Sequence, residues 1–472
     1  MATTHTTPQQ QRTFLSYRTV WRWHFYAGVF AVPFILWLAT TGSIYLFKPQ
    51  IESLIDRPYD SLYLNGQTAT AEAQVKAALA AVPGSTLHYY ELPRTTHSAT
   101  RIIIGRGTQE MRVYINPQTL QILKIADEDT RFMRIIFHLH GELFMGDRGS
   151  YIVELAASWA IVLILTGTYL WWPRQTNTLA GILYLRLHQG KRIFWRDLHA
   201  VTGIWISALA LFLIFTGLPW AKGWGSYLKT ARNLTTRSTM KADWTIGRSD
   251  ELAQRQALNY ASTNHASMST MSGMTAEEHT EHMHHAPSFS AISDYSSLAT
   301  IIATVTPLNL AYPVLISPPQ RPNGPWSAKS DAPNRPLRTT LTIDPHTGAI
   351  LHRQNFDQRP LIDRMVGIGV AAHEGQLFGL ANQLLGLATA LGLILLSLSA
   401  IVMWWRRRPD GVLGAPIPLT RPRFSPALAA LIIAIGIYLP MMGASLILVL
   451  LIERFVLRRI PATSRWLGLT AP

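Results

Sequence analysis

Long apolar runs separated by polar connections dominate the pattern of hydrophobic and polar positions along the 472-residue chain. Each run has about twenty residues or more, the length that an α-helix needs to cross the hydrocarbon core of a bilayer. The pattern predicts five membrane-spanning helices, at residues 25–47, 152–172, 200–220, 377–405 and 427–456. Pro440 and Gly443 interrupt the last run, which we expect to be one kinked span, with a re-entrant hairpin as the alternative.

Basic residues gather beside the ends of these runs, in the leader 1–24 and in the short connections 173–199 and 406–426. Cytoplasmic loops of membrane proteins carry an excess of Lys and Arg, so we expect these three segments to face the cytoplasm. The long connections 48–151 and 221–376 then lie outside, in a bacterial periplasm, and residues 457–472 form a C-terminal tail. This arrangement predicts a multi-pass protein of the bacterial inner membrane, with membrane lipid around its helices.

Each long outer connection contains one strand-like stretch that ends in a turn. In "MRVYINPQTLQIL" (111–123) and "TTLTIDPHTGAIL" (339–351), alternating apolar residues precede Asn-Pro or Asp-Pro and a second short strand. This order is typical of a β-hairpin. The expected fold class is therefore a membrane all-α helical bundle with internal duplication, which carries two small α+β outer modules.

Composition narrows the function further. The chain has a formal net charge of +15, but its basic residues flank apolar runs instead of lining one soluble face, so we expect no nucleic-acid partner. It contains no cysteine, which excludes disulfides, thiolate metal sites and covalent haem attachment. Any haem would be of the non-covalent b type.

An internal repeat places histidines in register. Shifting the sequence by 175 residues superimposes two copies of H-x3-G-x12-T-G, one starting at His24 and the other at His199. The first glycines of the two motifs are Gly28 and Gly203, and the second are Gly42 and Gly217. The first glycine lies one helical turn beyond the histidine, and the second lies five turns beyond it, about 27 Å along the helix.

A shift of 233 residues superimposes "TGTYLWWPR" (166–174) on "SAIVMWWRR" (399–407) and places His140 on His373. Each of these two histidines lies 31 residues before a tryptophan of its motif. His138, two residues earlier than His140, is the alternative member of this pair.

The expected topology puts His24 and His199 at the cytoplasmic face and His140 and His373 at the outer face. Two neutral imidazoles from facing helices are suitable axial ligands of a low-spin haem iron. A single histidine at a helix start is more often an interfacial residue, and small residues in membrane helices usually serve packing. The fourfold register favours two b-type haems, with the four motif glycines giving each macrocycle a smooth helix face.

The segment "HASMSTMSGMTAEEHTEHMHH" (265–285) differs in composition from the rest of the chain, with no apolar period. Its His and Met residues are ligand types that suit copper or zinc, and the densest group is His282, Met283, His284 and His285. The alternative is a solvated low-complexity insertion without a ligand.

The histidine-bearing stretches resemble a known family. "WRWHFYAGVFAVPFILWLATTGSIYLFKPQIE", "LHGELFMGDRGSYIVELAASWAIVLILTGTYLWWPR", "FWRDLHAVTGIW" and "AAHEGQLFGLANQLLGL" are similar to the bacterial PepSY-associated transmembrane proteins, which include ferrisiderophore reductases. The resemblance covers nearly the whole chain outside the leader and residues 265–285. It implies PepSY-like outer modules, b-haem ligation by the four paired histidines, and a role in siderophore-iron uptake.

The sequence thus predicts an inner-membrane ferric-chelate reductase with no catalytic residues beyond those that hold the two haems. Electrons from membrane quinol or a cytoplasmic reductase would cross to a ferric siderophore or another ferric chelate. No G-x-G-x-x-G at a helix start and no P-loop indicates a bound nucleotide. The alternatives are a transporter with a histidine proton relay and a periplasmic protein that handles copper, zinc or iron without redox turnover.

Overall fold

The computed structural model describes residues 17–173, 178–235, 244, 246–263, 294–319, 324–416 and 426–469. The chain divides into two compact units. The first unit comprises Met1–Gly42, Ser150–Trp224 and Leu387–Pro472, and the second comprises Ser43–Gly149 and Gly225–Gly386. The His/Met-rich segment 265–285 lies outside the described residues.

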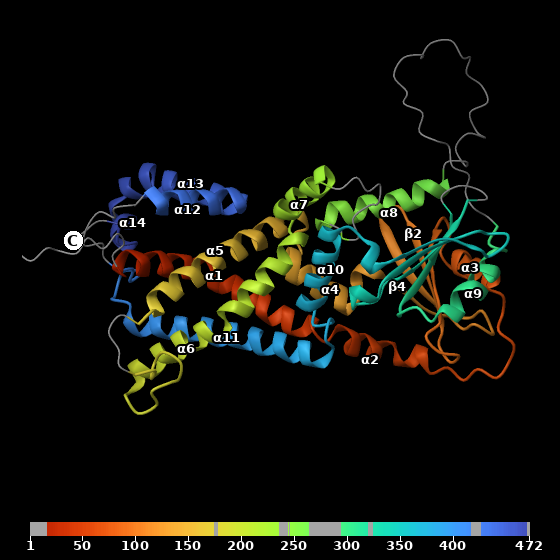
Figure 1. The fold of residues 1–472 in the computed structure, drawn as a ribbon, viewed down its shortest axis with the longest axis horizontal. Helices are drawn as coiled ribbons and strands as arrows, with labels where there is room; N and C mark the ends of the chain where they lie inside the picture. The colour runs from red at the N-terminus through yellow and green to blue at the C-terminus, as the bar shows by residue number, and fades with distance from the viewer. Residues whose placement is uncertain are drawn as a thin grey trace, which may run out of the picture. The chain divides into compact units, whose positions relative to one another are not determined.

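Long apolar helices supply most of the first unit (Figure 1). Five helical stretches in the described part of the chain are long and apolar enough to cross a membrane, so the chain is a multi-pass membrane protein. Four of them contain the helices α1 (Tyr17–Tyr45), α5 (Asp147–Trp171), α6 (Lys191–Gly217) and α11 (Leu380–Arg407). They match the first four predicted spans in order.

Two of these helices begin earlier than the sequence predicts. The predicted boundaries leave His24 in the leader and His199 in a loop, but α1 begins at Tyr17 and α6 at Lys191, so both histidines lie inside helices. Hydropathy marks only the apolar part of a span. A helix continues past that part because its backbone groups stay hydrogen-bonded and its Arg and Lys side chains extend toward water.

The last apolar run is a helical hairpin, so the expectation of one kinked span is wrong. It forms α12 (Pro426–Tyr438) and α13 (Pro440–Phe455), which meet at a sharp corner at Leu439. The chain reverses at Leu439, whose ψ of 81° is not helical, because the residue before a proline is sterically disfavoured in the α conformation. A Cβ on Gly443 would lie 2.6 Å from the Gly436 carbonyl oxygen, so the two helices approach at glycine.

The two ends of this hairpin meet again. The Leu413 N–H donates to the Trp466 carbonyl, which joins the loop before α12 to α14 (Pro461–Trp466) at 2.9 Å. Arg22 of α1 donates to the Pro416 and Gly468 carbonyls. The basic tail therefore returns to the end of the unit where α1 begins, as the positive-inside rule requires of a basic segment.

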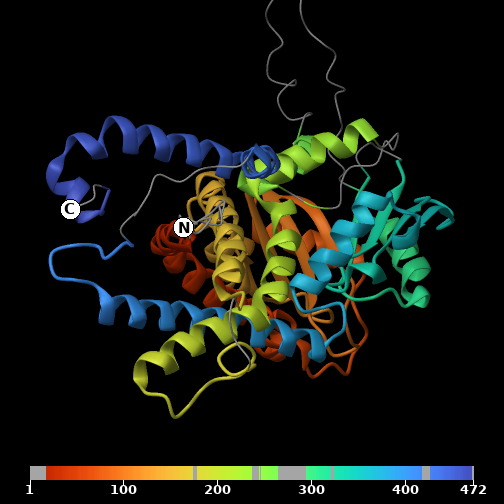
Figure 2. The ribbon, with the colours of Figure 1, turned by 60° about the vertical axis from the view of Figure 1, so that its left-hand side comes forward.

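An eight-stranded antiparallel sheet forms the centre of the second unit, with strand order β4-β3-β2-β1-β5-β6-β7-β8. Its first half is visible as orange strands and its second as green-blue strands in Figures 1 and 2. The strands are β1 (Thr86–Glu91), β2 (Thr100–Arg106), β3 (Gln109–Ile115), β4 (Ile122–Asp127), β5 (Val314–Ser317), β6 (Trp326–Ser330), β7 (Thr339–Ile343) and β8 (Ile350–Asn355).

Both predicted hairpins are confirmed, as β3–β4 and β7–β8. The pairing of β1 with β5 joins the two outer segments into one sheet, which no local pattern indicated. This pairing satisfies two edges that would otherwise expose backbone hydrogen-bonding groups. That these segments are PepSY-like modules stays a prediction.

The core of this unit lies on one face of the sheet. Alternate strand residues such as Ile102, Val113 and Leu341 are fully buried there. They pack against α3 (Ala71–Ala81) and α9 (Leu298–Val305). Each half of the sheet therefore has the same order of one helix and four strands, as the internal duplication predicts.

The remaining helices of the second unit include the two that carry His140 and His373. These are α4 (Phe132–Glu142), which follows β4, and α10 (Leu361–His373), which follows β8. The others are α2 (Lys48–Asp60), α7 (Lys222–Thr235) and α8 (Gly247–Thr263). Asn259 of α8 accepts hydrogen bonds from His88 and Thr86 of β1.

The hairpin predicts that both termini lie on the same side of the membrane, because the segments before α12 and after α13 meet each other and Arg22 of α1. A green fluorescent protein, which folds only in the cytoplasm, should fluoresce when fused to either terminus of the full chain. A chain truncated after Gln376 and fused to the same reporter follows three spans and should stay dark. If the N-terminal fusion fluoresces and the C-terminal fusion does not, the termini lie on opposite sides, and the last run is a single kinked span.

Candidate functional site

The structure brings His24 of α1 and His199 of α6 together inside the first unit. Their ring centroids lie 6.3 Å apart, and the ring planes meet at 85°. Both side chains are partly buried. The two histidines that the 175-residue repeat relates are thus a facing pair.

The separation of the rings distinguishes two kinds of contact. An imidazole nitrogen lies about 1.1 Å from its ring centre and about 2.0 Å from a bound metal ion, so a linear N–metal–N arrangement puts the centroids about 6.3 Å apart. A direct N–H···N hydrogen bond of about 2.9 Å would bring them to about 5.2 Å. The observed 6.3 Å is therefore too long for a direct N–H···N hydrogen bond and leaves the space that an ion between the rings would need. Rotation about a linear N–metal–N axis leaves the angle between the ring planes free.

A hydroxyl group fixes which nitrogen of His24 carries the proton. Thr166 of α5 donates its own hydroxyl proton to the Val162 carbonyl at 2.6 Å. Its oxygen lies 3.0 Å from His24 Nδ1 and can only accept there, so Nδ1 carries the hydrogen. The Nε2 atom then carries the lone pair that a metal ion needs.

The same arrangement holds His199. Ser399 of α11 donates its hydroxyl proton to the Leu396 carbonyl at 2.8 Å. His199 Nδ1 lies 3.1 Å from the Ser399 hydroxyl and 3.1 Å from that same carbonyl, so two acceptors face it. Nδ1 therefore carries the hydrogen here as well, and Nε2 is the nitrogen available to a ligand.

The sequence analysis missed these two hydroxyls, although the signal was present. Thr166 and Ser399 are the first residues of the two stretches that the 233-residue shift superimposes. It also missed Gly167, where a Cβ would lie 3.2 Å from His24 Cε1. The glycine lets the imidazole lie directly against α5. A hydroxyl at a repeated position, aligned with a repeated histidine, could have been identified from the repeat alone.

His140 of α4 and His373 of α10 form a second pair, inside the second unit. Their ring centroids also lie 6.3 Å apart, with ring planes at 69°. His373 is the last residue of α10, and His140 lies two residues before the end of α4. Two pairs in different units therefore have the same centroid separation.

A glycine and an asparagine lie next to the second pair along the chain and across a hydrogen bond. A Cβ on Gly141, the residue after His140, would meet no atom within 4 Å. Asn382 donates through Nδ2 to the Ala372 carbonyl, next to His373, while its buried Oδ1 has no hydrogen-bond partner. The helix face at Gly141 is thus open, and the Asn382 oxygen is a buried acceptor that remains unsatisfied.

His138, the alternative to His140, has different neighbours. Its Nδ1 lies 3.1 Å from Glu142, and its Nε2 lies 3.8 Å from Asp129. Burial alone would lower the pKa of His138, but the carboxylates of Asp129 and Glu142 raise it above its ordinary value. His138 is therefore an ion-pairing residue of the second unit, and the structure pairs His140 with His373.

The motif glycines divide into two kinds. A Cβ on Gly203 would lie 3.1 Å from Leu396, so this glycine serves the packing of α6 on α11. At Gly28 a Cβ would meet only Leu163, at an ordinary 3.8 Å, so protein packing does not require glycine there. Gly42 lies near the end of α1, and Gly217 is the last residue of α6.

Glu154 is a buried carboxylate in α5, and its partners show a structural role. Its Oε2 accepts hydrogen bonds from the backbone N–H groups of Gly223 and Trp224, in the first turn of α7. A carboxylate at this place satisfies N–H groups that have no partner within the helix. It is therefore a helix cap.

The metal ligands predicted in the His/Met-rich segment, His282, Met283, His284 and His285, lie outside the described residues. Within the residues that the structure describes, no group of three or more His, Asp or Glu side chains is placed to hold a metal ion. Each of the two histidine pairs brings together two imidazoles only.

Comparison with known protein families gives one result. A family model described as the PepSY-associated TM region matches residues 21–407, a stretch that includes all four paired histidines. None of the curated proteins compared with the chain matches it.

The raised pKa of His138 predicts a pH-dependent stability. A group whose pKa is higher in the folded state stabilises fully below its unfolded value of about 6.5, and this contribution disappears as the pH rises through the folded value. The melting temperature of the wild type should therefore fall more steeply above pH 6.5 than that of His138→Gln. His352→Gln, on exposed β8, is the control. Parallel curves for wild type and His138→Gln would contradict the ion-pairing role.

Proposed function

The chain belongs to the PepSY-associated transmembrane family, and we propose that it is a di-haem oxidoreductase of the inner membrane. It would pass electrons from the cytoplasmic side to a ferric siderophore or another ferric chelate outside, and so release Fe(II) for uptake. The observation that supports this proposal most is the duplicated histidine pair, with 6.3 Å between ring centroids in each.

The residues present fit a b-type haem at each pair. Each pair would hold the haem iron through two imidazole nitrogens, and no third His, Asp or Glu side chain joins either pair among the described residues, which would leave the remaining iron ligands to the porphyrin. With no cysteine in the chain, attachment would be non-covalent. A haem held this way supplies one-electron redox chemistry.

The chain's own residues position the imidazoles and set their basicity. Thr166 and Ser399 accept hydrogen bonds from the Nδ1–H groups of the first pair, which orients each ring and makes it a stronger donor. Gly167 admits the His24 ring against α5. These contacts preorganise the pair, since little rearrangement is needed when a ligand binds.

Positive charge surrounds the first pair. The Arg407 guanidinium lies 4.7 Å from the centre of the Trp21 ring, one turn before His24. Arg406 lies 5.9 Å from the centre of the Trp195 ring, one turn before His199. Cations held on aromatic faces near the imidazoles would pair with the acidic side groups of a porphyrin.

The substrate follows from the chemistry of iron. Oxygen-rich chelators bind the hard Fe(III) ion far better than Fe(II), so adding one electron loosens the chelate. The electron would come from membrane quinol or from a cytoplasmic reductase. The protein needs no nucleophile or general acid for this step, because only an electron is transferred.

A transporter with a histidine proton relay is the alternative of a different class. Direct proton transfer between paired rings would require a hydrogen bond, which the centroid distance of 6.3 Å is too long to allow. In the first pair both Nδ1 atoms already donate to oxygen acceptors. Neither feature favours a relay.

Each histidine pair should account for one haem. Purified His199→Ala and His373→Ala proteins should each contain about one haem per chain, against about two in the wild type, and the double variant should contain none. Haem content is measured by pyridine haemochrome and by reduced-minus-oxidised absorbance. His138→Gln should keep both haems. A His199→Ala protein that keeps its full haem content would contradict the proposal.

Removing the hydroxyl acceptors should raise a reduction potential without loss of haem. A ring that no longer donates from Nδ1 is a weaker ligand and stabilises Fe(III) less. For Thr166→Val we expect a rise of tens of millivolts, since about 1 kcal/mol per hydrogen bond corresponds to about 40 mV for one electron. Ser399→Ala should shift the potential less, because the Leu396 carbonyl still accepts from His199.

A spectroelectrochemical titration measures these shifts. Thr168→Val is the matched control, because its hydroxyl donates to the Ile164 carbonyl in the same helix. The assignment of Nδ1 as the donor fails if Thr166→Val and Thr168→Val have the same potentials as the wild type.

A further inference from the structure

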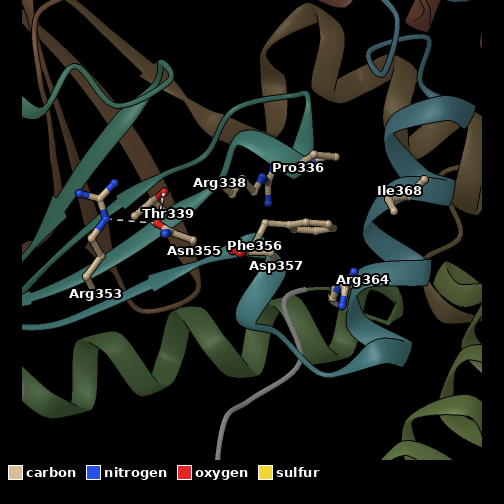
Figure 3. A pocket seen from close by; sticks show the side chains of 9 residues that line it. All are labelled: Pro336, Arg338, Thr339, Arg353, Asn355, Phe356, Asp357, Arg364 and Ile368. Carbon is tan, nitrogen blue, oxygen red and sulfur yellow. Dashed lines mark hydrogen bonds between the residues drawn. The ribbon is translucent and has the colours of Figure 1, made fainter.

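A cavity of about 530 Å³ lies in the second half of the sheet, where β7, β8 and α10 meet. Three arginines line it: Arg338, which directly precedes β7, Arg353 of β8 and Arg364 of α10. Figure 3 shows Arg338 and Arg364 on opposite sides of Phe356, and Arg353 beyond Thr339 and Asn355.

The three guanidinium groups are not equally neutralised. Arg338 forms an ion pair with Asp331 at 3.1 Å and donates to the Ala332 carbonyl, so its position is fixed by the protein. Arg353 donates from Nε to the Asn355 side-chain oxygen, a neutral acceptor. Among the residues that the structure describes, neither Arg353 nor Arg364 has a carboxylate within ion-pair distance. Asp357 is the only acidic side chain in the lining.

The first half of the sheet has a cavity of about 310 Å³ at the corresponding place, between β3, β4 and α4, where α2 also lines it with Glu52 and Asp56. Its lining contains the acids Glu52, Asp56 and Asp127 and the bases Lys124 and Arg131. The two halves share the order of their elements, but the charge of the two cavities has diverged. Shared architecture therefore does not explain the three arginines, because the first half builds the same corner with balanced charge.

The basic cavity lies apart from the second histidine pair. Arg364 is nine residues before His373 on α10, which is two and a half turns, so the two side chains project from opposite faces of the helix. Phe356 forms one wall of the cavity and packs on α10 at Gly367, where a Cβ would lie 2.6 Å from its ring. The Phe356 ring therefore fills the space between the cavity and α10 at this point.

We propose that this cavity captures a polycarboxylate anion, and that the ferric chelate of the proposed function, on which this inference rests, is of the carboxylate class. Planar guanidinium groups bind carboxylates in a two-point fork, and three of them spread around one cavity match an anion with several carboxylates. The aromatic ring between them can cover the apolar skeleton of such a molecule.

A single phosphate fits this cavity less well. Built phosphate sites are compact and depend on converging backbone N–H groups at a helix N-terminus or a turn. Here the donors are side chains from three separate segments around about 530 Å³. The cavity is therefore better matched in size and donor type to a larger anion.

Isothermal titration calorimetry on the full-length protein in detergent tests the proposal. The probe is Ga(III)–citrate, because Ga(III) is a hard trivalent ion that does not take up an electron under these conditions. We expect saturable binding that weakens at least tenfold in Arg353→Gln/Arg364→Gln. The matched control, Arg57→Gln/Arg106→Gln, removes two exposed arginines of the same unit and should bind as the wild type does. Citrate alone and inorganic phosphate are titrated in parallel.

Three results would overturn the proposal: no saturable binding, equal binding by the two double variants, or phosphate binding as tight as that of the citrate complexes. Haem content is measured on the same samples. A protein that lacks haem but binds Ga(III)–citrate at the arginines would reject the oxidoreductase and keep the anion site. A protein that contains two haems but binds no anion would reject the anion site and keep the oxidoreductase.

Discussion

The hydrogen bond from an imidazole Nδ1–H to a hydroxyl oxygen is the interaction on which the first site depends. An imidazole can donate from either nitrogen, and only one tautomer presents Nε2 as a ligand. In α5 and α11 the hydroxyls of Thr166 and Ser399 have already given their protons to carbonyls of their own helices. They can therefore only accept from the histidines. A helix-internal hydrogen bond thus determines the protonation of a side chain on a neighbouring helix.

Duplication explains how a complete site arises from incomplete halves. Each copy of the repeat supplies one histidine to each pair, so neither copy can form a two-histidine site alone. The sheet of the second unit follows the same logic, because β1 and β5 would each be an exposed edge without the other copy. Once two copies are joined, they can diverge without loss of architecture, as the different charges of the two cavities show.

The C-terminal hairpin illustrates how two constraints combine. An apolar run interrupted by Pro440 is compatible with a kink or with a reversal, and the proline alone does not decide between them. The basic residues after α13 favour the end of the bundle where the other basic segments lie. The close approach of Gly436 and Gly443 lets the helices fold back against each other and satisfies that preference.

The sequence by itself determined the multi-pass architecture, both β-hairpins and three of the four paired histidines, His24, His199 and His373. These depend on apolar length, strand alternation and repeat register, all of which are local or periodic along the chain. Tertiary structure alone decided the β1–β5 pairing, the direction of the last helix and the choice of His140 over His138. It also decided the tautomers, through Thr166 and Ser399. Each of these depends on groups far apart in the chain. Neither residue spacing nor composition shows which hydrogen-bond acceptor a histidine will contact or which strand edge will pair with another.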